Sequence, residues 1–201
     1  MTTPPQRVDG RTARSERTRN AIVDALVRLI DEGDLRPTAD RIAKLAGVSL
    51  RALWSHFADM ETLFAASGQR ILERRDASFA PIPADLPLAG RISAYCHQRA
   101  RLLEQIAPAA RAAALKEPFS PALQHYRKLH VERVRDEVRV LFADEIGEDE
   151  EVLHALTSVS MWYHWDTLRT PMGLTPEQAR ATLQRTITAL LDRPDAQAQA
   201  T

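Results

Sequence analysis

Apolar residues recur at three- and four-residue intervals along most of the chain, which is the spacing of one helical face. The first such run includes Ile22, Leu26, Leu29 and Ile30, and it stops before Gly33, a residue type common at helix ends. In the later part of the chain no segment shows the strict alternation expected of a β-strand. The pattern therefore predicts an all-α fold.

Two short helices joined by a tight turn are predicted at residues 38–57, TADRIAKLAGVSLRALWSHF. In the first helix, Ile42 and Leu45 fall on one face. Gly47 stands at the break, where a positive φ is cheap only for glycine. Ser49 follows, and its hydroxyl can cap the next helix by accepting a hydrogen bond from a backbone N–H.

The second of these helices has one inward face, formed by Leu53 and Phe57. Its other side chains remain available at the surface: Leu50, Arg51, Ala52, Trp54, Ser55 and His56. A two-helix corner with a glycine turn is typical of the helix-turn-helix, whose second helix enters the major groove of DNA. The alternative is a plain corner between two helices of a domain that has no DNA partner.

The flanks of this corner carry a family resemblance. An amphipathic helix, then PTADRIAKLAGVS, then LWSHF and an acid-capped helix resemble the amino-terminal domain of the TetR family of transcriptional regulators, over about residues 15–66. The rest of the chain matches that family only in layout. The resemblance implies an all-helical second domain that binds small molecules and dimerises, and operator DNA that is released when a ligand binds.

Arg51 is the strongest candidate for reading a base, because a guanidinium pairs bidentately with guanine. Leu50, Ala52 and Ser55 are expected to face base edges beside it. Other side chains would hold phosphates and set the register of the protein on the duplex. The complete predicted DNA-binding set is Thr38, Lys44, Ser49, Leu50, Arg51, Ala52, Trp54, Ser55 and His56.

The sequence departs from the family pattern at two positions. Trp54 stands where a tyrosine is common, and its indole N–H can still donate a hydrogen bond to a phosphate. Met60 stands where a lysine often holds a phosphate at the start of the fourth helix. The missing cation would weaken DNA binding unless the basic amino-terminal arm compensates.

Further helices are predicted from caps and prolines. Asp59 can cap a helix that ends before a proline-rich linker, and Pro108 is expected to end the helix that follows the linker. Ser120 precedes a proline at the first helical position, and Thr175 with Gln178 forms a capping box. The predicted helices cover about residues 59–78, 92–106, 111–115, 120–141, 148–168 and 175–191.

These patterns divide the chain into four parts. We expect a disordered basic arm at residues 1–14, a helix-turn-helix DNA-binding domain at 15–58, a helical regulatory and dimerisation domain at 59–193, packed as an antiparallel bundle, and a disordered tail at 194–201. The arm is either a solvated tail or a contact with phosphates or the minor groove.

Charge and cysteine content narrow the class further. The formal net charge is zero, but residues 1–57 contain more basic than acidic side chains and the remainder contains more acidic ones. Cys96 is the only cysteine, which excludes an intrachain disulfide and fits a reducing cytoplasm. No apolar run approaches the about 20 residues of a membrane helix, and the start lacks a secretory signal. We expect a soluble, cytoplasmic protein.

Candidate catalytic and metal-binding chemistry is weak. Cys96 and His97 are adjacent on a helix, so their side chains point about 100° apart and His97 is badly placed to activate the thiol. The histidines form no pair at metal-ligand spacing, and there is no glycine-rich phosphate loop. We therefore expect neither an enzyme nor a metal or other cofactor.

Aromatic residues are densest at Trp162, Tyr163 and Trp165, and aromatic cavities with a few polar groups typically bind small molecules. The set predicted to line a site for an unknown effector is Tyr95, Arg99, Phe119, Tyr126, His130, Trp162 and Trp165. The alternative is that these aromatics belong to the core or to a dimer interface.

Leu183, Ile187 and Leu190 form one stripe near the carboxyl end, which is predicted to be the homodimer interface unless it faces this chain's own core. A single helix-turn-helix buries too little surface to bind DNA tightly, whereas a dimer places two of them on a palindromic operator. The predicted function is thus a ligand-released homodimeric repressor. The alternative is a helical ligand-binding or scaffold protein that no longer reads DNA.

Overall fold

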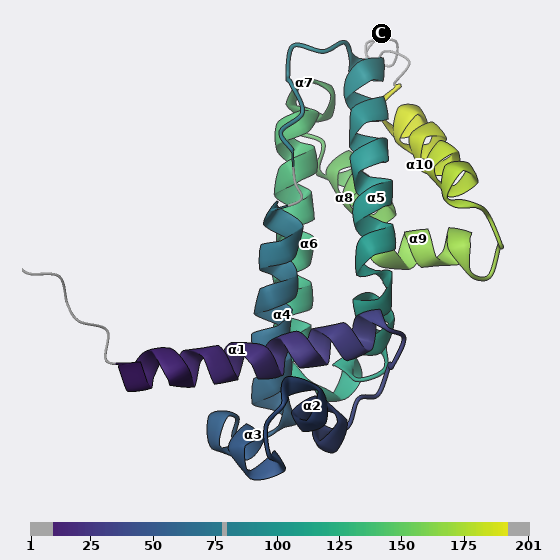
Figure 1. Ribbon diagram of the computed structural model, residues 1–201. Helices are drawn as coiled ribbons and strands as arrows, with labels where there is room; N and C mark the ends of the chain where they lie inside the picture. The colour runs from purple at the N-terminus through teal and green to yellow at the C-terminus, as the bar shows by residue number, and fades with distance from the viewer. Residues whose placement is uncertain (1–9, 78–79, 193–201) are drawn as a thin grey trace, which may run out of the picture.

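The computed structural model describes residues 10–77 and 80–192. Within these residues the chain forms ten α-helices and one 3-10 helix, and it forms no strand (Figure 1). The all-α prediction is confirmed. The helices pack around two separate hydrophobic clusters, the first near the amino terminus and the second in the carboxyl-terminal part.

Four helices build the amino-terminal part: α1 (Gly10–Asp31), α2 (Ala39–Ala46), α3 (Leu50–His56) and α4 (Met60–Ala77). Helix α1 crosses α4, and α2 and α3 lie together at one end of the molecule (Figure 1). The apolar stripe of α1 is buried as predicted, with Ile22 and Leu26 inaccessible to solvent. Ile42, Leu53 and Leu63 complete the first cluster from α2, α3 and α4.

The predicted disordered arm is wrong for residues 10–14, which form the first residues of α1. This segment has no apolar periodicity, but it also lacks proline, and its polar side chains do not oppose helix formation. The Thr18 hydroxyl donates to the Arg14 carbonyl at 3.1 Å within this turn. Residues 1–9 and the predicted tail at 194–201 lie outside the described residues, and the domain boundaries remain predictions.

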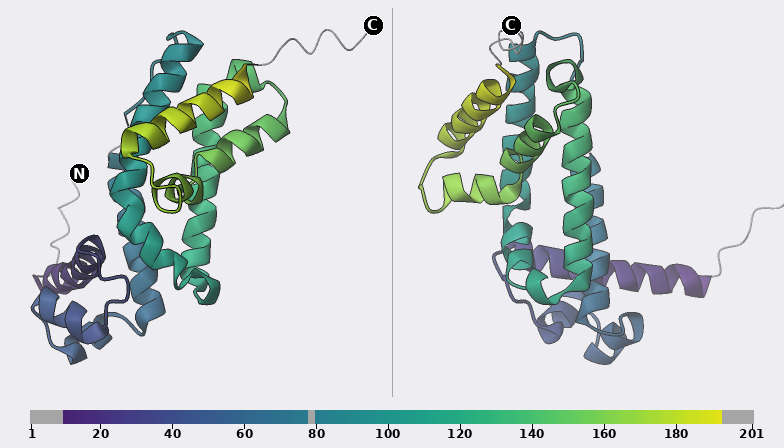
Figure 2. Two further views of the ribbon diagram at one scale, coloured as in Figure 1. Left: turned by 90° about the vertical axis from the view of Figure 1, so that its right-hand side faces the viewer. Right: turned by 180° about the vertical axis from the view of Figure 1, so that it is seen from behind.

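The remaining helices build the carboxyl-terminal part (Figures 1 and 2). They are α5 (Leu88–Ala114), the 3-10 helix η1 (Glu117–Phe119), α6 (Pro121–Leu141), α7 (Ala143–Ile146), α8 (Glu150–Val159), α9 (Trp162–Arg169) and α10 (Pro176–Leu191). The predicted caps at their starts are confirmed. The Ser120 hydroxyl accepts from the Leu123 N–H, and Thr175 and Gln178 form the capping box of α10.

Helix α5 continues through Pro108, although the sequence predicted that it would end there. The proline cannot donate to the carbonyl four residues earlier, so the helix loses a hydrogen bond at this point. Packing on both sides offsets that loss, because Leu103 is buried in the second cluster and Ala112 in the first. Sequence alone could not show that α5 reaches both clusters.

The helix predicted at residues 148–168 is two helices, α8 and α9, which separate at Ser160. The Arg99 side chain is 2% exposed, and its Nε donates to the Ser160 carbonyl at 2.8 Å. The break therefore frees a carbonyl that a buried guanidinium satisfies. A charged residue on a different helix determines this break, so local pattern gave no signal for it.

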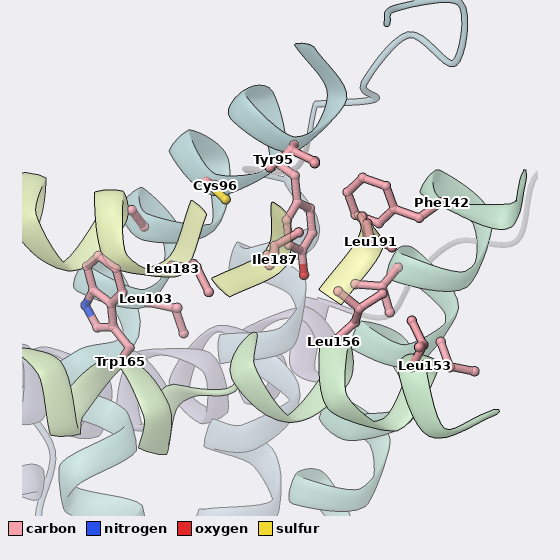
Figure 3. Packing of buried hydrophobic residues seen from close by; sticks show 14 of the residues in the cluster. Tyr95, Cys96, Leu103, Phe142, Leu153, Leu156, Trp165, Leu183, Ile187 and Leu191 are labelled. Atoms are coloured by element: carbon pink, nitrogen blue, oxygen red, sulfur yellow. The ribbon is translucent and has the colours of Figure 1, made fainter. Parts of the chain in front are cut away.

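Figure 3 shows the second cluster, in which α5, α8 and α10 converge around Leu103, Leu156 and Leu183. Leu183 and Ile187 are fully buried here, and Leu190 packs half-buried against the same cluster. The prediction that this stripe is the dimer interface is wrong, because its two central residues are inaccessible to a partner. The stripe faces this chain's own core, which was the alternative.

Cys96 lies in the same cluster (Figure 3). Burial raises the pKa of its thiol to about 12, which disfavours the thiolate that a nucleophile requires. The His97 side chain is exposed, and its Nδ1 lies 2.8 Å from the Ser93 carbonyl oxygen. The two residues therefore form no catalytic pair.

Candidate nucleic-acid interface and regulatory cavity

Helices α2 and α3 are held at a fixed corner by three local devices. The Thr38 hydroxyl accepts from the Arg41 N–H at 3.4 Å and so caps α2. Gly47 ends α2 with φ 69°, in the left-handed region. The Ser49 hydroxyl accepts from the Ala52 N–H at 3.1 Å and so caps α3. The helix-turn-helix that the sequence predicted is present.

The inward face of α3 attaches it to α1. Leu53 is inaccessible, and Phe57 is 1% exposed just beyond the end of α3. The Arg19 guanidinium of α1 lies over the Phe57 ring, 4.8 Å from its centroid, in a cation–π contact. The position of α3 is therefore set by the first cluster.

None of the nine side chains predicted to contact DNA is buried in the core. The Leu50 and Trp54 side chains are 38% and 39% exposed. Arg51 is also exposed, so its guanidinium is accessible to a base edge. The rest divide into exposed residues, Thr38, Lys44, Ser49 and Ser55, and half-buried residues, Ala52 and His56.

The hydroxyl groups of α2 and α3 differ in whether their O–H is free to donate a hydrogen bond. Thr38 and Ser49 use their oxygens as acceptors within the caps, so each retains an O–H that can donate to a phosphate. The Ser55 hydroxyl instead donates to the Ala52 carbonyl at 2.7 Å. The Ser55 O–H is therefore engaged within α3, whereas its oxygen can still accept a hydrogen bond.

The start of α4 contains no cation, as the sequence indicated. Met60 is half-buried against the first cluster, and Asp59 caps the helix by accepting from the Thr62 N–H at 2.7 Å. This hydrogen bond lowers the pKa of the Asp59 carboxyl below its ordinary value. This helix start therefore presents a carboxylate where the family pattern has a cation.

A cavity of about 860 Å³ lies between α4, residues 81–84, α5 and α6. Its apolar walls are formed by Leu72, Pro81, Ile82, Ala84, Tyr95, Leu129, Val140 and Leu141. Polar and charged groups complete the lining: Gln69, Glu73, Glu132, Arg133, Asp136 and Glu137. The volume falls within the range of pockets that bind small molecules.

Of the seven residues predicted to line a ligand site, Tyr95 lines this cavity. Arg99 lies directly behind the wall, with its Nη1 3.4 Å from a Glu137 carboxylate oxygen. Trp162 and Trp165 are buried in the second cluster, as the alternative predicted, and the Trp165 indole donates to Glu104 at 2.7 Å.

The other three predicted lining residues lie elsewhere. Phe119 is 88% exposed on η1, so it lines no cavity. Tyr126 faces Gly68 and a smaller cavity between α1 and α4. His130 is half-buried on α6 outside the lining of the large cavity. Aromatic density did not locate this cavity, because its walls are mostly aliphatic and charged and come from α4, residues 81–84, α5 and α6.

In the described part of the chain, no helix is long and apolar enough to cross a membrane. Nor do the described residues contain a group of three His, Cys, Asp or Glu side chains arranged to hold a metal ion.

Comparison with known proteins agrees with the geometry of the corner. The family model of the bacterial regulatory proteins of the TetR family matches residues 22–67, from the apolar stripe of α1 to the first half of α4. The chain is a TetR-family regulator. The family is not enzymatic, which confirms the prediction that the chain is not an enzyme. Comparison with curated proteins found no relative of significant similarity.

Solved structures share the whole TetR-like fold. A transcriptional regulator from Rhodococcus sp. Rha1 is 22% identical with a TM-score of 0.66, over 88% of this chain and 95% of its own. A Rhodococcus sp. protein assigned to the TetR-family regulators is 17% identical with a TM-score of 0.63, over 87% and 99%. A regulator assigned in Pseudomonas aeruginosa PAO1 is 19% identical with a TM-score of 0.60, over 92% and 93%. These likenesses show a common fold.

The left-handed turn at Gly47, between α2 and α3, predicts that Gly47→Ala and Gly90→Ala change the free energy of unfolding in opposite directions. Gly47→Ala places a Cβ at φ 69° and should lower the free energy of unfolding by about 1–2 kcal/mol. Gly90→Ala, the matched control in the first turn of α5, meets ordinary contacts and should raise it by about 0.5–1 kcal/mol. Urea unfolding measures both, and equal effects would contradict the assigned turn.

Proposed function

We propose that this TetR-family DNA-binding regulator is a homodimeric repressor, and that a small molecule in the large cavity releases it from operator DNA. The observation that carries the proposal is the course of α4. The helix starts directly after the reading corner, and its later residues Gln69, Leu72 and Glu73 line the cavity. One rigid element therefore contacts both the reading head and the ligand site.

For DNA reading, we place α3 in the major groove. Its exposed side presents Arg51 at the first turn, where a recognition helix meets base edges. Leu50 and Ala52 flank Arg51 and offer apolar contact to thymine methyl groups. Thr38, Lys44, Trp54 and His56 surround this face and supply donors for phosphates.

We place the dimer interface on the outward faces of α8 and α10, because the stripe of Leu183 and Ile187 is buried in this chain's own core. Ala181, Arg185 and Ala189 lie at four-residue intervals on the exposed side of α10, along a shallow groove. Helix α10 packs against α8 at the outer side of the carboxyl-terminal part (Figure 2). Small residues allow close approach of a second copy, and two such helix pairs would form an isologous interface.

For the effector, the chemistry of the cavity favours an amphipathic molecule. Its walls are largely aliphatic, and its charged groups are four carboxylates and one guanidinium. An anion would be opposed by this balance, so a neutral or positively charged molecule fits better. The identity of the effector follows from no single residue.

The assignment of α3 predicts two different mutational outcomes. Arg51→Ala should weaken operator binding by about 1–3 kcal/mol and relax the preference at one operator position. His56→Ala should weaken binding to all sequences alike, because phosphates carry no sequence information. Binding to a randomised duplex library measures both. An unchanged preferred sequence in Arg51→Ala would contradict the groove assignment.

The dimer surface predicts a change of assembly. Ala189→Arg introduces a charge on the exposed side of α10 and should convert a dimer into a monomer at micromolar concentration. Ala143→Arg, on the exposed surface of α7, is the matched control and should leave the dimer intact. Sedimentation velocity distinguishes the two, and a dimer that survives Ala189→Arg would contradict the placement.

The cavity predicts reciprocal coupling between ligand and operator. A compound selected because it releases labelled operator should bind the DNA-bound protein more weakly, with a coupling of about 1–3 kcal/mol. Calorimetric titration with and without operator measures this coupling. Ala84→Trp, which fills the cavity, should abolish the response and retain operator binding. Equal affinities of the compound for the free and the operator-bound protein would show that the cavity is not coupled to DNA binding.

A further inference from the structure

The amino-terminal end of α6 is capped by a residue of α4. The Ala122 N–H donates to Glu61 Oε1 at 2.7 Å, and the Ser120 hydroxyl donates to the same carboxylate, 2.8 Å from Oε2. Ser120 itself accepts from the Leu123 N–H at 3.2 Å, and Pro121 has no N–H to satisfy. Glu61 thus completes a helix cap about 60 residues further along the chain.

These hydrogen bonds are stronger than ordinary surface contacts. They are charge-assisted, and the carboxylate sits at the positive end of the α6 dipole. Ser120 is 3% exposed, so water does not readily replace its partner. Glu61 is not needed by its own helix, because Asp59 already caps α4 through Thr62.

The same seam continues along both helices. A Cβ at Gly68 of α4 would lie 2.6 Å from the Tyr126 ring of α6, so the two helices approach closely at this point. Beyond it, residues of α4 and α6 form opposite walls of the large cavity. The Glu61 cap therefore lies at the reading-head end of the seam and the cavity lies at the other end.

We infer that Glu61 is a positioning residue for operator binding: by capping α6, it fixes the orientation of the reading head relative to the carboxyl-terminal part. The inference rests on the proposed function, since operator affinity is its output. Its central prediction for operator affinity is opposite to the one that net charge alone would give. Removal of an acidic residue from a DNA-binding head should strengthen binding through charge alone, whereas loss of the cap should weaken it.

Two substitutions of Glu61 separate geometry from charge. Glu61→Asp keeps the charge but shortens the side chain by one methylene, so it loses the reach to Ala122. Glu61→Gln removes the charge but keeps the length, and its carboxamide oxygen can still accept from Ala122. Glu16→Ala removes an exposed acidic residue of α1 without touching α6 and serves as the matched control.

Operator affinity, measured by fluorescence anisotropy at fixed salt, gives the first readout. Glu61→Asp should weaken operator binding about tenfold, the size expected when a charge-assisted hydrogen bond is lost, with little change on non-operator DNA. Glu61→Gln should weaken operator binding clearly less than Glu61→Asp, because a neutral hydrogen bond to Ala122 remains, and Glu16→Ala should leave it equal or tighter. Unchanged operator binding in Glu61→Asp, or loss in Glu61→Gln alone, would overturn the inference.

A second readout needs no DNA and no effector. Spin labels at Arg36→Cys and Lys128→Cys, both exposed, report the distance between the head and α6, while native Cys96 is buried. Glu61→Asp should broaden the distance distribution and Glu61→Gln should not. An equally narrow distance distribution in Glu61→Asp would overturn the inference. Failure of the unmodified protein to bind any operator would contradict the proposed function alone, because the distance measurement does not depend on DNA.

Discussion

Helix α4 packs against the first hydrophobic cluster on one side and against α6 on the other, and the arrangement of the rest of the molecule depends on this constraint. On one side Leu63 is inaccessible within the first cluster, which also fixes α1, α2 and α3. On the other side α4 lies so close to α6 that Gly68 leaves no room for a side chain beside Tyr126. Close-packed interiors do not deform continuously, so a tilt of α4 moves the reading head with it.

Polar contacts along α4 reinforce this packing unequally. Arg70 and Arg74 pair with Asp24 and Asp31 of α1 at 2.8 and 3.1 Å, but these groups are largely exposed and each pair stabilises little. The Glu61 contact with α6 is more sheltered and charge-assisted. The attachment of α4 to α1 therefore depends mainly on apolar burial, whereas its attachment to α6 also depends on a few directional hydrogen bonds.

The sequence predicted the features that local chemistry determines. Gly47 marks the turn because only glycine adopts its φ cheaply, and the caps by Ser49 and Thr175 follow from side chains that bond within three residues. Prediction from the sequence failed where residues distant in the chain determine where a helix begins or ends. Arg99 binds the Ser160 carbonyl between α8 and α9, and burial in two clusters keeps α5 helical through Pro108. Neither partner is visible in a local pattern.

The dimer stripe was misplaced, and most of the predicted ligand-lining residues lie outside the large cavity, for a related reason. Spacing shows that Leu183 and Ile187 share a face, but burial against α5 and α8, rather than spacing, makes that face a core. Aromatic density pointed to Trp162 and Trp165, while the cavity is lined mainly by aliphatic and charged side chains of α4 and α6. The buried and exposed positions of α3 were easier to predict, because they follow from helical spacing within one short helix.

The most direct test of the central role of α4 is the operator affinity of Gly68→Ala without any effector. The added methyl group would lie 2.6 Å from the Tyr126 ring, so α4 and Tyr126 must move apart at this point. We expect this separation to imitate a ligand that parts α4 from α6. We predict a weaker operator complex in a folded dimer, restored when Tyr126→Ala removes the Cγ and ring atoms that the methyl group would meet. Unchanged operator affinity in Gly68→Ala would contradict the account.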